Sequence, residues 1–571
     1  MNDSESKPLS DVERIKSASQ HLRGTLVESL ADPLTGAIAD DDTQLSKFHG
    51  IYQQDDRDIR QERRKQRLEP AFSFMIRARI PGGRMTPAQW LAFDAIGRRY
   101  GNDSVRVTTR QAVQFHGVIK RRLKTTMQAI NTSLLDTLAA CGDVNRNVMA
   151  PANPATSPAF AAVQAAAQSM SDHLCPRTNA YHEVWLDKEK LIDTADEVEP
   201  IYGKTYLPRK FKAAFVIPPD NDVDVYSQDL GFVAVVEAGQ LVGFNVMVGG
   251  GMGMSHGEPE TYPRLASTIG FCRPAAVNAV AAAVVTTQRD FGDRTNRKHA
   301  RLKYTIDTHG LAWFRDEVNR RLDEPLEAAR EVRFTHTGDR YGWQQASDGS
   351  WQHTFFVENG RVADSESQQL LSAMREIASL NAGAFILTPN QNVIVAGLND
   401  AERREVAALI AKYNLSSDSV SALRAHSLAC VGFPTCGLAM AESERYMPEL
   451  VTKVDALLDK HGVADVPIVA RMTGCPNGCA RPYLAEIGLV GKAPGRYNLL
   501  LGASFNGDRL NRLYKENIDE TEILATLDEL FAGFASQRHA AESFGDFLHR
   551  SGRLTRSGTP TDFHSPQAVT R

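Results

Sequence analysis

The sequence VRVTTRQAVQFHGV at residues 105–118 returns in outline as FILTPNQNVIVAGL at residues 385–398. Each copy consists of an apolar run, a T-x-x-Q segment (Thr108–Gln111 and Thr388–Gln391) and a second apolar run. Apolar runs on either side of a short polar segment predict two paired strands joined by a turn. Recurrence at a separation of about 280 residues indicates an internal duplication that encloses an inserted domain. Chance similarity is the alternative.

The segments upstream of the two copies also correspond. Residues 72–80, FSFMIRARI, alternate as a strand, and Thr86 followed by proline suits the start of a helix that reaches Gly101. Residues 353–359, HTFFVEN, have strand character, and the apolar residues between 370 and 378 have helical spacing. The same order of elements therefore occurs twice. We predict an α+β fold with two half-units related by pseudo-twofold symmetry.

The duplication divides the chain into five segments. We predict an N-terminal arm at 1–65, a first half-unit at 66–140, an α/β domain at 141–345, a second half-unit at 346–415 and a final unit at 416–571. The charged run DDRDIRQERRKQR at 55–67 is either a solvated helix or a docking element for a partner subunit.

Composition narrows the class of protein. The chain has 571 residues, of which 42% are hydrophobic and 23% charged, as in soluble globular proteins. No apolar run reaches the length of about 18 residues that a transmembrane helix needs, and the polar start lacks a secretory signal, so we expect a cytoplasmic protein that spans no membrane. The net charge of −4 gives no general attraction to nucleic acid.

Seven cysteines, an odd number, argue for reduced thiols and against a disulfide framework. Four form two close pairs, Cys430 and Cys436 in ACVGFPTCGLA and Cys475 and Cys479 in TGCPNGCARP. Their spacings differ from the C-x2-C knuckles typical of structural zinc, which favours an iron–sulfur cluster over a zinc site or inert thiols. Pro476 is the expected first residue of a helix, with Cys475 and Cys479 on one face.

Arginine and lysine are concentrated in otherwise apolar segments. The motifs contain Arg77 and Arg79, Arg106 and Arg110, Arg146, then Arg209, Lys210 and Lys212 in YLPRKFK, and the basic run RTNRKHARLKY at 294–304. Buried cations need anionic partners, which a polycarboxylate cofactor or an oxyanion substrate would supply. Ordinary ion pairs are the alternative. The glycine-rich GGGMGMS at 249–255 lacks the third glycine of a dinucleotide fingerprint, so electrons must come from another protein.

These motifs together resemble the sulfite/nitrite reductase family, and the resemblance runs nearly from end to end. It includes PGGRMT, TTRQ, GDVNRNV, LPRKFK, NRKHARLKY and TGCPNGCARP. The resemblance implies a three-domain fold with duplicated ferredoxin-like half-units around sirohaem. It also implies that Cys430, Cys436, Cys475 and Cys479 hold a [4Fe–4S] cluster, and that Cys479 is shared between the cluster and the sirohaem iron.

The resemblance also implies residue roles. Arg79, Arg146, Lys210 and Lys212 would surround the substrate. Arg106, Arg110, Gln111, His116, Arg209, Lys303, Gln391, Asn477 and Cys479 would contact the macrocycle or its carboxylates, with a satisfied core histidine as the alternative for His116. Nitrite reductases of the family tend to have asparagine where this chain has Lys212, so the second lysine favours sulfite.

The implied reaction is the six-electron reduction of sulfite to sulfide, in sulfate assimilation and cysteine biosynthesis. Electrons would come from a flavoprotein subunit that carries FAD and FMN, oxidises NADPH and docks on the N-terminal arm. A ferredoxin-dependent sulfite or nitrite reductase is the alternative enzyme. A non-catalytic zinc protein or a nucleic-acid binder is the alternative of a different class.

Overall fold

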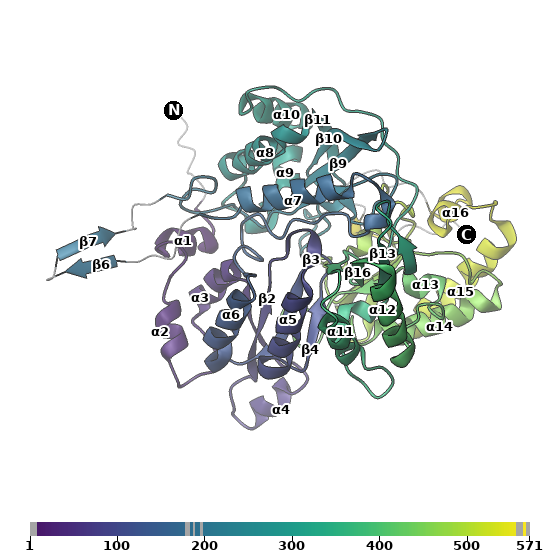
Figure 1. The fold of residues 1–571 in the computed structure, drawn as a ribbon, viewed down its shortest axis with the longest axis horizontal. Coiled ribbons are helices and arrows are strands. Elements are labelled where there is room, and N and C mark those ends of the chain that lie inside the picture. The colour runs from purple at the N-terminus through teal and green to yellow at the C-terminus, as the bar shows by residue number, and fades with distance from the viewer. Residues whose placement is uncertain (1–7, 178–182, 187–188, 194–197, 555–562, 567–571) are drawn as a thin grey trace.

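The computed structural model describes residues 8–177, 183–186, 189–193, 198–554 and 563–566. Over these residues the chain forms four sheets of four or five strands and a separate hairpin. Figure 1 shows the two half-units side by side in the lower part of the view, with the middle domain above them and the C-terminal unit on the right. This arrangement confirms the α+β class and the duplicated half-units.

Each half-unit contributes a short strand to the sheet of the other half-unit. The first sheet has the order β1 (Ile51–Asp55), β2 (Phe72–Arg77), β5 (Val113–Val118), β4 (Ser104–Val107) and β14 (Arg361–Ala363). The second has the order β12 (Gly342–Gln345), β13 (Trp351–Phe355), β16 (Val393–Leu398), β15 (Ala384–Leu387) and β3 (Arg84–Met85). In sequence β3 belongs to the first copy and β14 to the second, so the two strands are exchanged reciprocally.

The two T-x-x-Q turns have the same hydrogen bonds. Thr108 Oγ1 accepts from the backbone N–H groups two and four residues ahead, both at 3.2 Å, and Thr388 Oγ1 does the same at 3.2 and 3.0 Å. Gln111 Nε2 donates to the last carbonyl of β15 at 2.9 Å, while Gln391 Nε2 donates to the last carbonyl of β4 at 3.4 Å. Each glutamine thus joins its own copy to the other.

Four helices cover the outer faces of these sheets, and the two half-units share one apolar core. They are α5 (Pro87–Tyr100), α6 (Leu123–Thr132), α11 (Leu370–Ser379) and α12 (Asp400–Lys412). Thr86 caps α5 as predicted, since its Oγ1 accepts from Gln89 N at 3.2 Å while the Gln89 side chain accepts from Thr86 N at 2.9 Å. Trp90 on α5 stacks on Phe385 of β15 with ring centres 4.9 Å apart.

The middle domain contains a four-stranded sheet with helices packed on one of its faces. Its elements are α7 (Phe160–His173), β8 (Ala213–Val216), β9 (Leu230–Glu237), β10 (Gln240–Val248), β11 (Ser267–Cys272), α8 (Val277–Phe291), α9 (Leu302–His309) and α10 (Leu311–Arg320). Phe215, Phe232 and Phe244 pack in its core, with ring centres 4.8 to 5.9 Å apart. The hairpin of β6 (Glu183–Leu186) and β7 (Glu189–Asp193) stands away from the body in Figure 1.

The C-terminal unit places its first three strands in parallel. Its elements are α13 (Ala422–Ala425), β17 (Ser427–Ala429), α14 (Met447–Lys460), β18 (Ala470–Thr473), β19 (Ile487–Ala493), β20 (Arg496–Leu501), β21 (Arg512–Ile518), α15 (Glu520–Gln537) and α16 (Phe544–Arg550). Strands β17 and β18 pair in parallel, so both end at the same edge of the sheet. The segments with the grouped cysteines begin at that edge.

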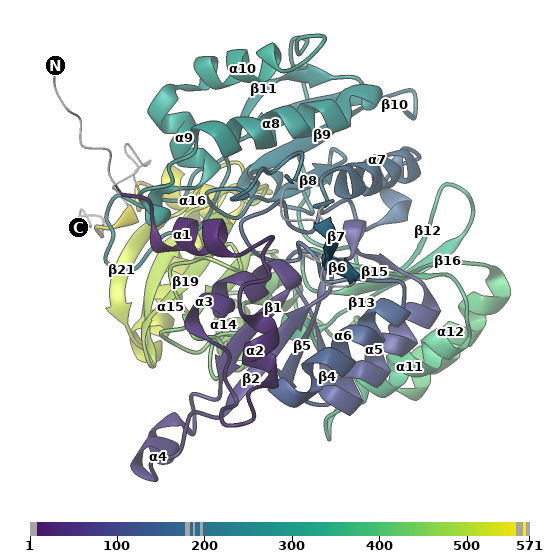
Figure 2. The same ribbon diagram turned by 90° about the vertical axis from the view of Figure 1, so that its left-hand side faces the viewer.

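The N-terminal region is more integrated than the predicted arm. Its helices are α1 (Asp11–Ala18), α2 (Leu26–Ala31), α3 (Asp40–Leu45) and α4 (Arg60–Lys65). Strand β1 forms an edge of the first sheet, and the buried Lys16 of α1 donates to Glu13 at 2.5 Å and to the Leu207 carbonyl at 2.8 Å. Of these four helices, α4 projects from the body (Figure 2). None of the helices described is both long enough and apolar enough to span a bilayer.

Candidate functional site

Parallel pairing brings the two cysteine loops together. Cys430 directly follows β17, and its N–H donates to the Met472 carbonyl of β18 at 3.1 Å. Gly474, which follows β18 and precedes Cys475, donates its N–H to Cys430 Sγ at 3.3 Å. The Gly474 carbonyl accepts from the N–H of Met440 at 2.7 Å, which folds the end of the first loop onto the second. A side chain at Gly474 would collide with backbone, since a Cβ there would lie 2.7 Å from a carbonyl oxygen.

The four thiols lie within electrostatic range of one another. Burial, with repulsion from Cys479 and Cys436, raises the pKa of Cys430 to about 12. Burial and the charges of Cys479 and Cys430 also raise the pKa of Cys475, and burial and Cys479 raise that of Cys436. Four neighbouring thiolates therefore cannot form together without positive charge among them. This donor set fits a cationic metal–sulfur cluster.

The predicted helix at Pro476 is wrong. Residues 474–481 form successive turns, with Gly478 N donating to the Cys475 carbonyl at 3.4 Å and Arg481 N to the Gly478 carbonyl at 2.9 Å. Gly478 and Arg481 have φ values of +63° and +56°, which a right-handed helix does not contain. These turns leave Cys479 exposed while Cys475 is buried.

Cations from the middle domain gather beside this site. The Arg146 segment runs alongside the YLPRKFK segment, with Arg146 N donating to the Phe211 carbonyl at 3.0 Å. Burial and repulsion, by Arg209 first, lower the pKa of Lys210 to about 7. Burial and the charge of Lys210 lower the pKa of Lys212 well below its usual value. The Cys479 thiol acts in the opposite direction on both lysines, so the cations lie within electrostatic range of the cysteine site.

We call the side chains of Arg110, Arg146, Arg209, Lys210 and Lys212 the cationic cluster. Burial and Arg146 lower the pKa of Arg110 to about 9, and burial and Arg297 lower that of Arg209 to about 10. The nearest acids already have partners.

Asp143 is bound by Arg297 at 2.7 Å, and Asp229 is bound by Arg301 at 2.8 Å. The cationic cluster is therefore short of negative charge, as a binding site for an anion would be.

Arg79 does not join the cationic cluster. Its Nη2 donates to Asp136 Oδ2 at 2.7 Å and its Nη1 to Ser171 Oγ at 3.1 Å. Strand β2 ends at Arg77, so the alternation predicted over residues 72–80 does not extend to Arg79. Arg77 faces the site instead. Its pairing partner on β5 is Gln114, and its charge lowers the pKa values of Arg110 and His116, after larger contributions from burial.

No sequence motif predicts the two groups that lie beside Arg77. Arg77 Nη1 donates to Cys141 Sγ at 2.9 Å, and its guanidinium lies 5.9 Å from the centre of the Tyr52 ring. Tyr52 also hydrogen-bonds with Cys141 and Arg146. Tyr52 belongs to β1, within the region predicted to be an arm. Only the pairing of β1 with β2 places it on the same face as Arg77.

Several expected macrocycle contacts have structural partners. Arg106 donates to Glu444 at 2.6 Å and to the Ala429 carbonyl at 3.0 Å, which joins the first half-unit to the first cysteine loop. Gln111 joins the half-units, as described above. Lys303 donates to the Gly251 and Gly253 carbonyls at 3.1 and 2.9 Å and so shapes the glycine-rich loop at 249–255.

That glycine-rich loop lies against the second cysteine loop. Met254 N donates to the Pro476 carbonyl at 2.9 Å, and a Cβ at Gly253 would lie 3.2 Å from the Asn477 carbonyl oxygen. Asn477 Nδ2 is 3.5 Å from Cys475 Sγ. The glycines of GGGMGMS thus allow close packing against the cysteine site. The comparison with a dinucleotide-binding fingerprint does not predict this role.

Buried polar atoms that lack a hydrogen-bond partner show whether the residues around the cysteine site fit a polar macrocycle. Among the described residues, Arg77 Nε, Arg110 Nε, Gln391 Oε1 and both ring nitrogens of His116 have no hydrogen-bond partner. Burial, then Arg361 and Arg106, lowers the pKa of His116 well below its usual value, so the ring is neutral. Buried polar atoms of this kind need partners. Together with the cationic cluster, they fit a polycarboxylate ligand such as sirohaem.

The charge deficit gives a testable dependence of stability on pH. The pKa of Lys210 is about 7 in the folded chain against 10.5 as a free side chain. Between these values the unfolded chain binds more protons, so the free energy of unfolding rises as the pH rises from about 7 to about 10.5. We expect Lys210→Met to make the cofactor-free protein more stable at pH 6 and to reduce this rise. Urea unfolding at pH 6, 8 and 10 measures the free energy of unfolding of both proteins. A pH dependence that the substitution leaves unchanged would contradict the prediction.

Comparison with known proteins identifies the family. A model described as the nitrite/sulfite reductase ferredoxin-like half domain matches residues 66–132 and 344–413, which coincide with the two half-units. A model described as the nitrite and sulphite reductase 4Fe-4S domain matches residues 165–326. That match covers the middle domain and not the cysteine loops. The solved structure of the Mycobacterium tuberculosis NirA protein has the same fold, with a TM-score of 0.76, 24% identity, and 95% of this chain and 97% of that chain covered.

Curated relatives are similar over nearly the whole chain. Proteins named sulfite reductase [NADPH] hemoprotein beta-component are 55% identical in Oceanobacillus iheyensis, over 99% of this chain and 98% of theirs, and 58% identical in Xanthomonas oryzae pv. oryzae, over 96% and 98%. The 4Fe-4S description and the word hemoprotein agree with the predicted cluster and sirohaem, and not with the zinc or nucleic-acid alternatives. The chain belongs to the nitrite and sulfite reductase family.

Proposed function

We propose that the chain is the haemoprotein (beta) subunit of an NADPH-dependent assimilatory sulfite reductase, which reduces sulfite to sulfide in the cytoplasm for cysteine biosynthesis. The observation that supports this most directly is a cationic cluster, short of negative charge, within electrostatic range of Cys479. A site of this kind can hold a doubly charged oxyanion beside a redox centre.

The chain's residues divide between two cofactors. Cys430, Cys436, Cys475 and Cys479 would hold a [4Fe–4S] cluster, while Arg110, Arg209, His116, Gln391 and Asn477 would contact sirohaem and its carboxylates. When bound, the two groups supply electrons and the iron at which sulfite is reduced.

The cationic side chains have two tasks in this proposal. Arg77, Arg146 and Lys212 compensate the charge of sulfite and of the oxygens that leave as water. We place Arg77 in the role first expected for Arg79, because Arg79 is occupied by Asp136. Lys210, with a pKa of about 7, can donate a proton and regain it near neutral pH. Each departing oxygen requires protons, so both tasks serve the same steps.

Purified protein tests the reaction directly. We expect the visible absorption of a haem, about four further irons with acid-labile sulfide, and formation of sulfide from sulfite with a chemical reductant. A colourless protein, or one that contains only zinc, would contradict the proposal. NADPH with the flavoprotein subunit, compared with reduced ferredoxin, separates the two donors, and nitrite in place of sulfite separates the two substrates.

The partner would approach at α4. Arg57, which precedes this helix, donates from Nη1 to the Cys436 carbonyl at 3.2 Å and lies 4.4 Å from the Phe433 ring centre. Leu438, on the same cysteine loop, is 69% exposed. A projecting basic helix next to an exposed apolar residue suits the acidic surface of an electron-carrying domain and offers a short route to the cysteine site.

Reversing the charge of α4 and of Arg67, which follows it, should slow electron delivery only. We expect Arg64→Glu, Lys65→Glu and Arg67→Glu together to lower the NADPH-driven rate about tenfold by slowing association. The rate with a chemical reductant should not change. Three exposed arginines on other surfaces, Arg315, Arg320 and Arg404, provide a control of equal charge. Equal NADPH-driven rates in the two triple variants would remove α4 from the docking surface.

A further inference from the structure

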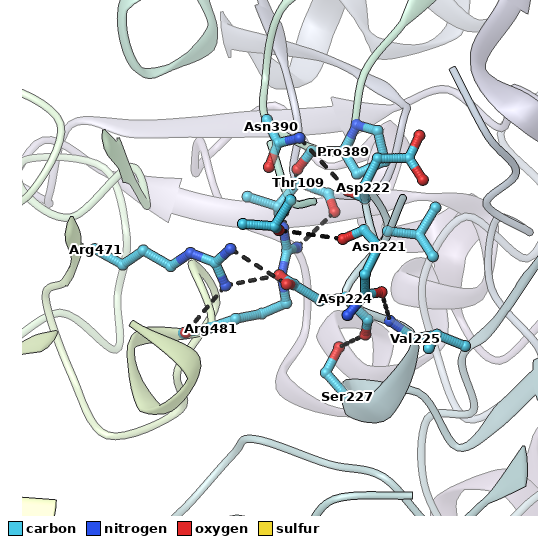
Figure 3. Close-up of polar contacts among 12 residues, drawn as sticks. Thr109, Asn221, Asp222, Asp224, Val225, Ser227, Pro389, Asn390, Arg471 and Arg481 are labelled. Atoms are coloured by element: carbon cyan, nitrogen blue, oxygen red, sulfur yellow. Dashed lines mark hydrogen bonds and ion pairs between the residues drawn. The ribbon is translucent and has the colours of Figure 1, made fainter. Parts of the chain in front are cut away.

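Three buried charged side chains meet where the middle domain contacts the C-terminal unit (Figure 3). Arg471 of β18 donates from Nη1 to Asp224 Oδ2 at 2.6 Å and from Nη2 to Asp224 Oδ1 at 3.3 Å. Arg481 also donates from Nε to Asp224 Oδ2. All three residues are at most 5% exposed, so solvent does not screen their interaction.

Arg481 reaches every other large unit of the protein. Besides Asp224 of the middle domain, its Nη1 donates to the Thr109 carbonyl at 2.9 Å and its Nη2 to the Pro389 carbonyl at 3.0 Å. Thr109 lies in the first T-x-x-Q turn and Pro389 in the second. One guanidinium thus binds both duplicated turns and the middle domain, and only a planar group with several donors can do so.

Arg481 also follows Cys479 by two residues. Thr109 Oγ1 donates to the Cys479 carbonyl at 3.1 Å, so the same turn that accepts from Arg481 returns a hydrogen bond to the cysteine loop. Arg110, which follows Thr109 in the sequence, belongs to the cationic cluster. The backbone of Arg481 has a φ of +56°, a conformation that non-glycine residues rarely adopt and that surrounding contacts must maintain.

Loss of any member would leave a buried group without its partners. Asp224 uses both carboxylate oxygens for the two arginines, and Arg481 uses three nitrogens for three different acceptors. Breaking a buried ion pair by removing one partner is strongly unfavourable. The contacts therefore fix the loop in one position.

We propose that Arg481, anchored by Asp224, is a positioning residue that fixes the Cys479 loop against both T-x-x-Q turns and so sets the place of Cys479 relative to the cationic cluster. The proposal rests on the proposed function for the identity of the cofactors. It assigns Arg481 no contact with substrate.

Arg481→Lys in the holoenzyme is the first test. Lysine keeps the charge and can reach Asp224, but it cannot also bind both turns. We expect iron and acid-labile sulfide contents to stay as in the unmodified protein. The reduction potential and the electron paramagnetic resonance spectrum of the bound cofactors should change. We also expect kcat for sulfite to fall about 10²-fold, because small displacements of reacting groups have effects of this size. Unchanged spectrum, potential and kcat would overturn the proposal.

Thr109 gives a second test that leaves the ion pairs intact. Thr109→Val removes the Oγ1 hydrogen bond to Cys479 but keeps the carbonyl that Arg481 needs, and Thr109→Ser restores the hydroxyl. We expect valine to shift the potential and spectrum in the same direction as Arg481→Lys, and serine to restore them. If Arg481→Lys loses its metal, this pair decides alone, and identical potentials in the valine and serine variants would overturn the proposal.

An ion pair between the two half-units serves as a control for a general loss of rigidity at interfaces. Arg375 on α11 donates to Asp94 on α5 at 2.7 Å, across the two half-units. Arg375→Lys should leave the potential and spectrum unchanged. A shift equal to that of Arg481→Lys would show an unspecific effect and count against the proposal. The potential and spectrum do not depend on which oxyanion is reduced, so a failure of the proposed substrate remains distinguishable.

Discussion

Replacing Cys475 with serine should abolish sulfite reduction and remove the visible absorption of the protein. Cys475 is buried where the ends of β17 and β18 meet, and its sulfur interacts with those of Cys479 and Cys430. A serine hydroxyl is a poor ligand for iron in a cluster that thiolates hold. Loss of one ligand at a buried position leaves the remaining thiols without compensating charge. We expect activity at the level of the background and little acid-labile sulfide.

Cys272 provides the matched control. It is also buried, and burial raises the pKa of its thiol to about 12, but it lies on β11 of the middle domain. Cys272→Ser should retain iron, acid-labile sulfide and most of the activity. Full activity and a normal spectrum in Cys475→Ser would contradict the assignment of the four cysteines. So would equal losses of iron in the two variants.

Lys212→Met should lower kcat for sulfite by about 10²–10³, the effect seen when one preorganised charge-stabilising group is lost. Methionine has similar length and no charge, and Lys212 lies among Lys210, Arg110 and Arg301 beside Cys479. The variant should contain its cofactors, because removing one cation from a crowded cluster relieves repulsion. Rates with a chemical reductant, measured with cofactor content, test this directly.

Lys204 offers a control on the preceding loop. It is exposed, and Lys204→Met should leave the rate unchanged. Sulfite turnover by Lys212→Met at the unmodified rate, with full sirohaem content, would withdraw the catalytic role of this lysine. Loss of sirohaem from the variant would instead assign Lys212 to cofactor binding.

The sequence was sufficient for the elements that follow a strict period. Alternation located β2 and β5, the Thr86 cap and Gly101 bounded α5, and the repeated T-x-x-Q segments revealed the duplication. The sequence also placed each cysteine pair in a short loop that begins just after a strand, but the meeting of the two loops depends on the parallel pairing of β17 and β18. Local signals determine the elements and the duplication, and tertiary contacts bring the loops together.

Other features depend on contacts that no local pattern contains. The break of β2 after Arg77 turns Arg79 towards Asp136, which lies far along the chain. The polar sequence IYQQD of β1 resembles an exposed segment until β2 supplies its partner. The turns after Cys475 replace a helix because Gly478 and Arg481 both adopt left-handed conformations, and acceptors from three other units hold Arg481 in place.

The reciprocal placement of β3 and β14 makes the two copies inseparable. Each sheet ends in a strand supplied by the other copy, at β14 beside β4 and at β3 beside β15. A fragment that contains only one repeat would have an unpaired sheet edge and one strand without a pairing partner. Exposed edges of this kind promote aggregation. Two such fragments could recover their structure only by crossing over with each other. The geometry is therefore that of a dimer whose subunits have been fused into one polypeptide.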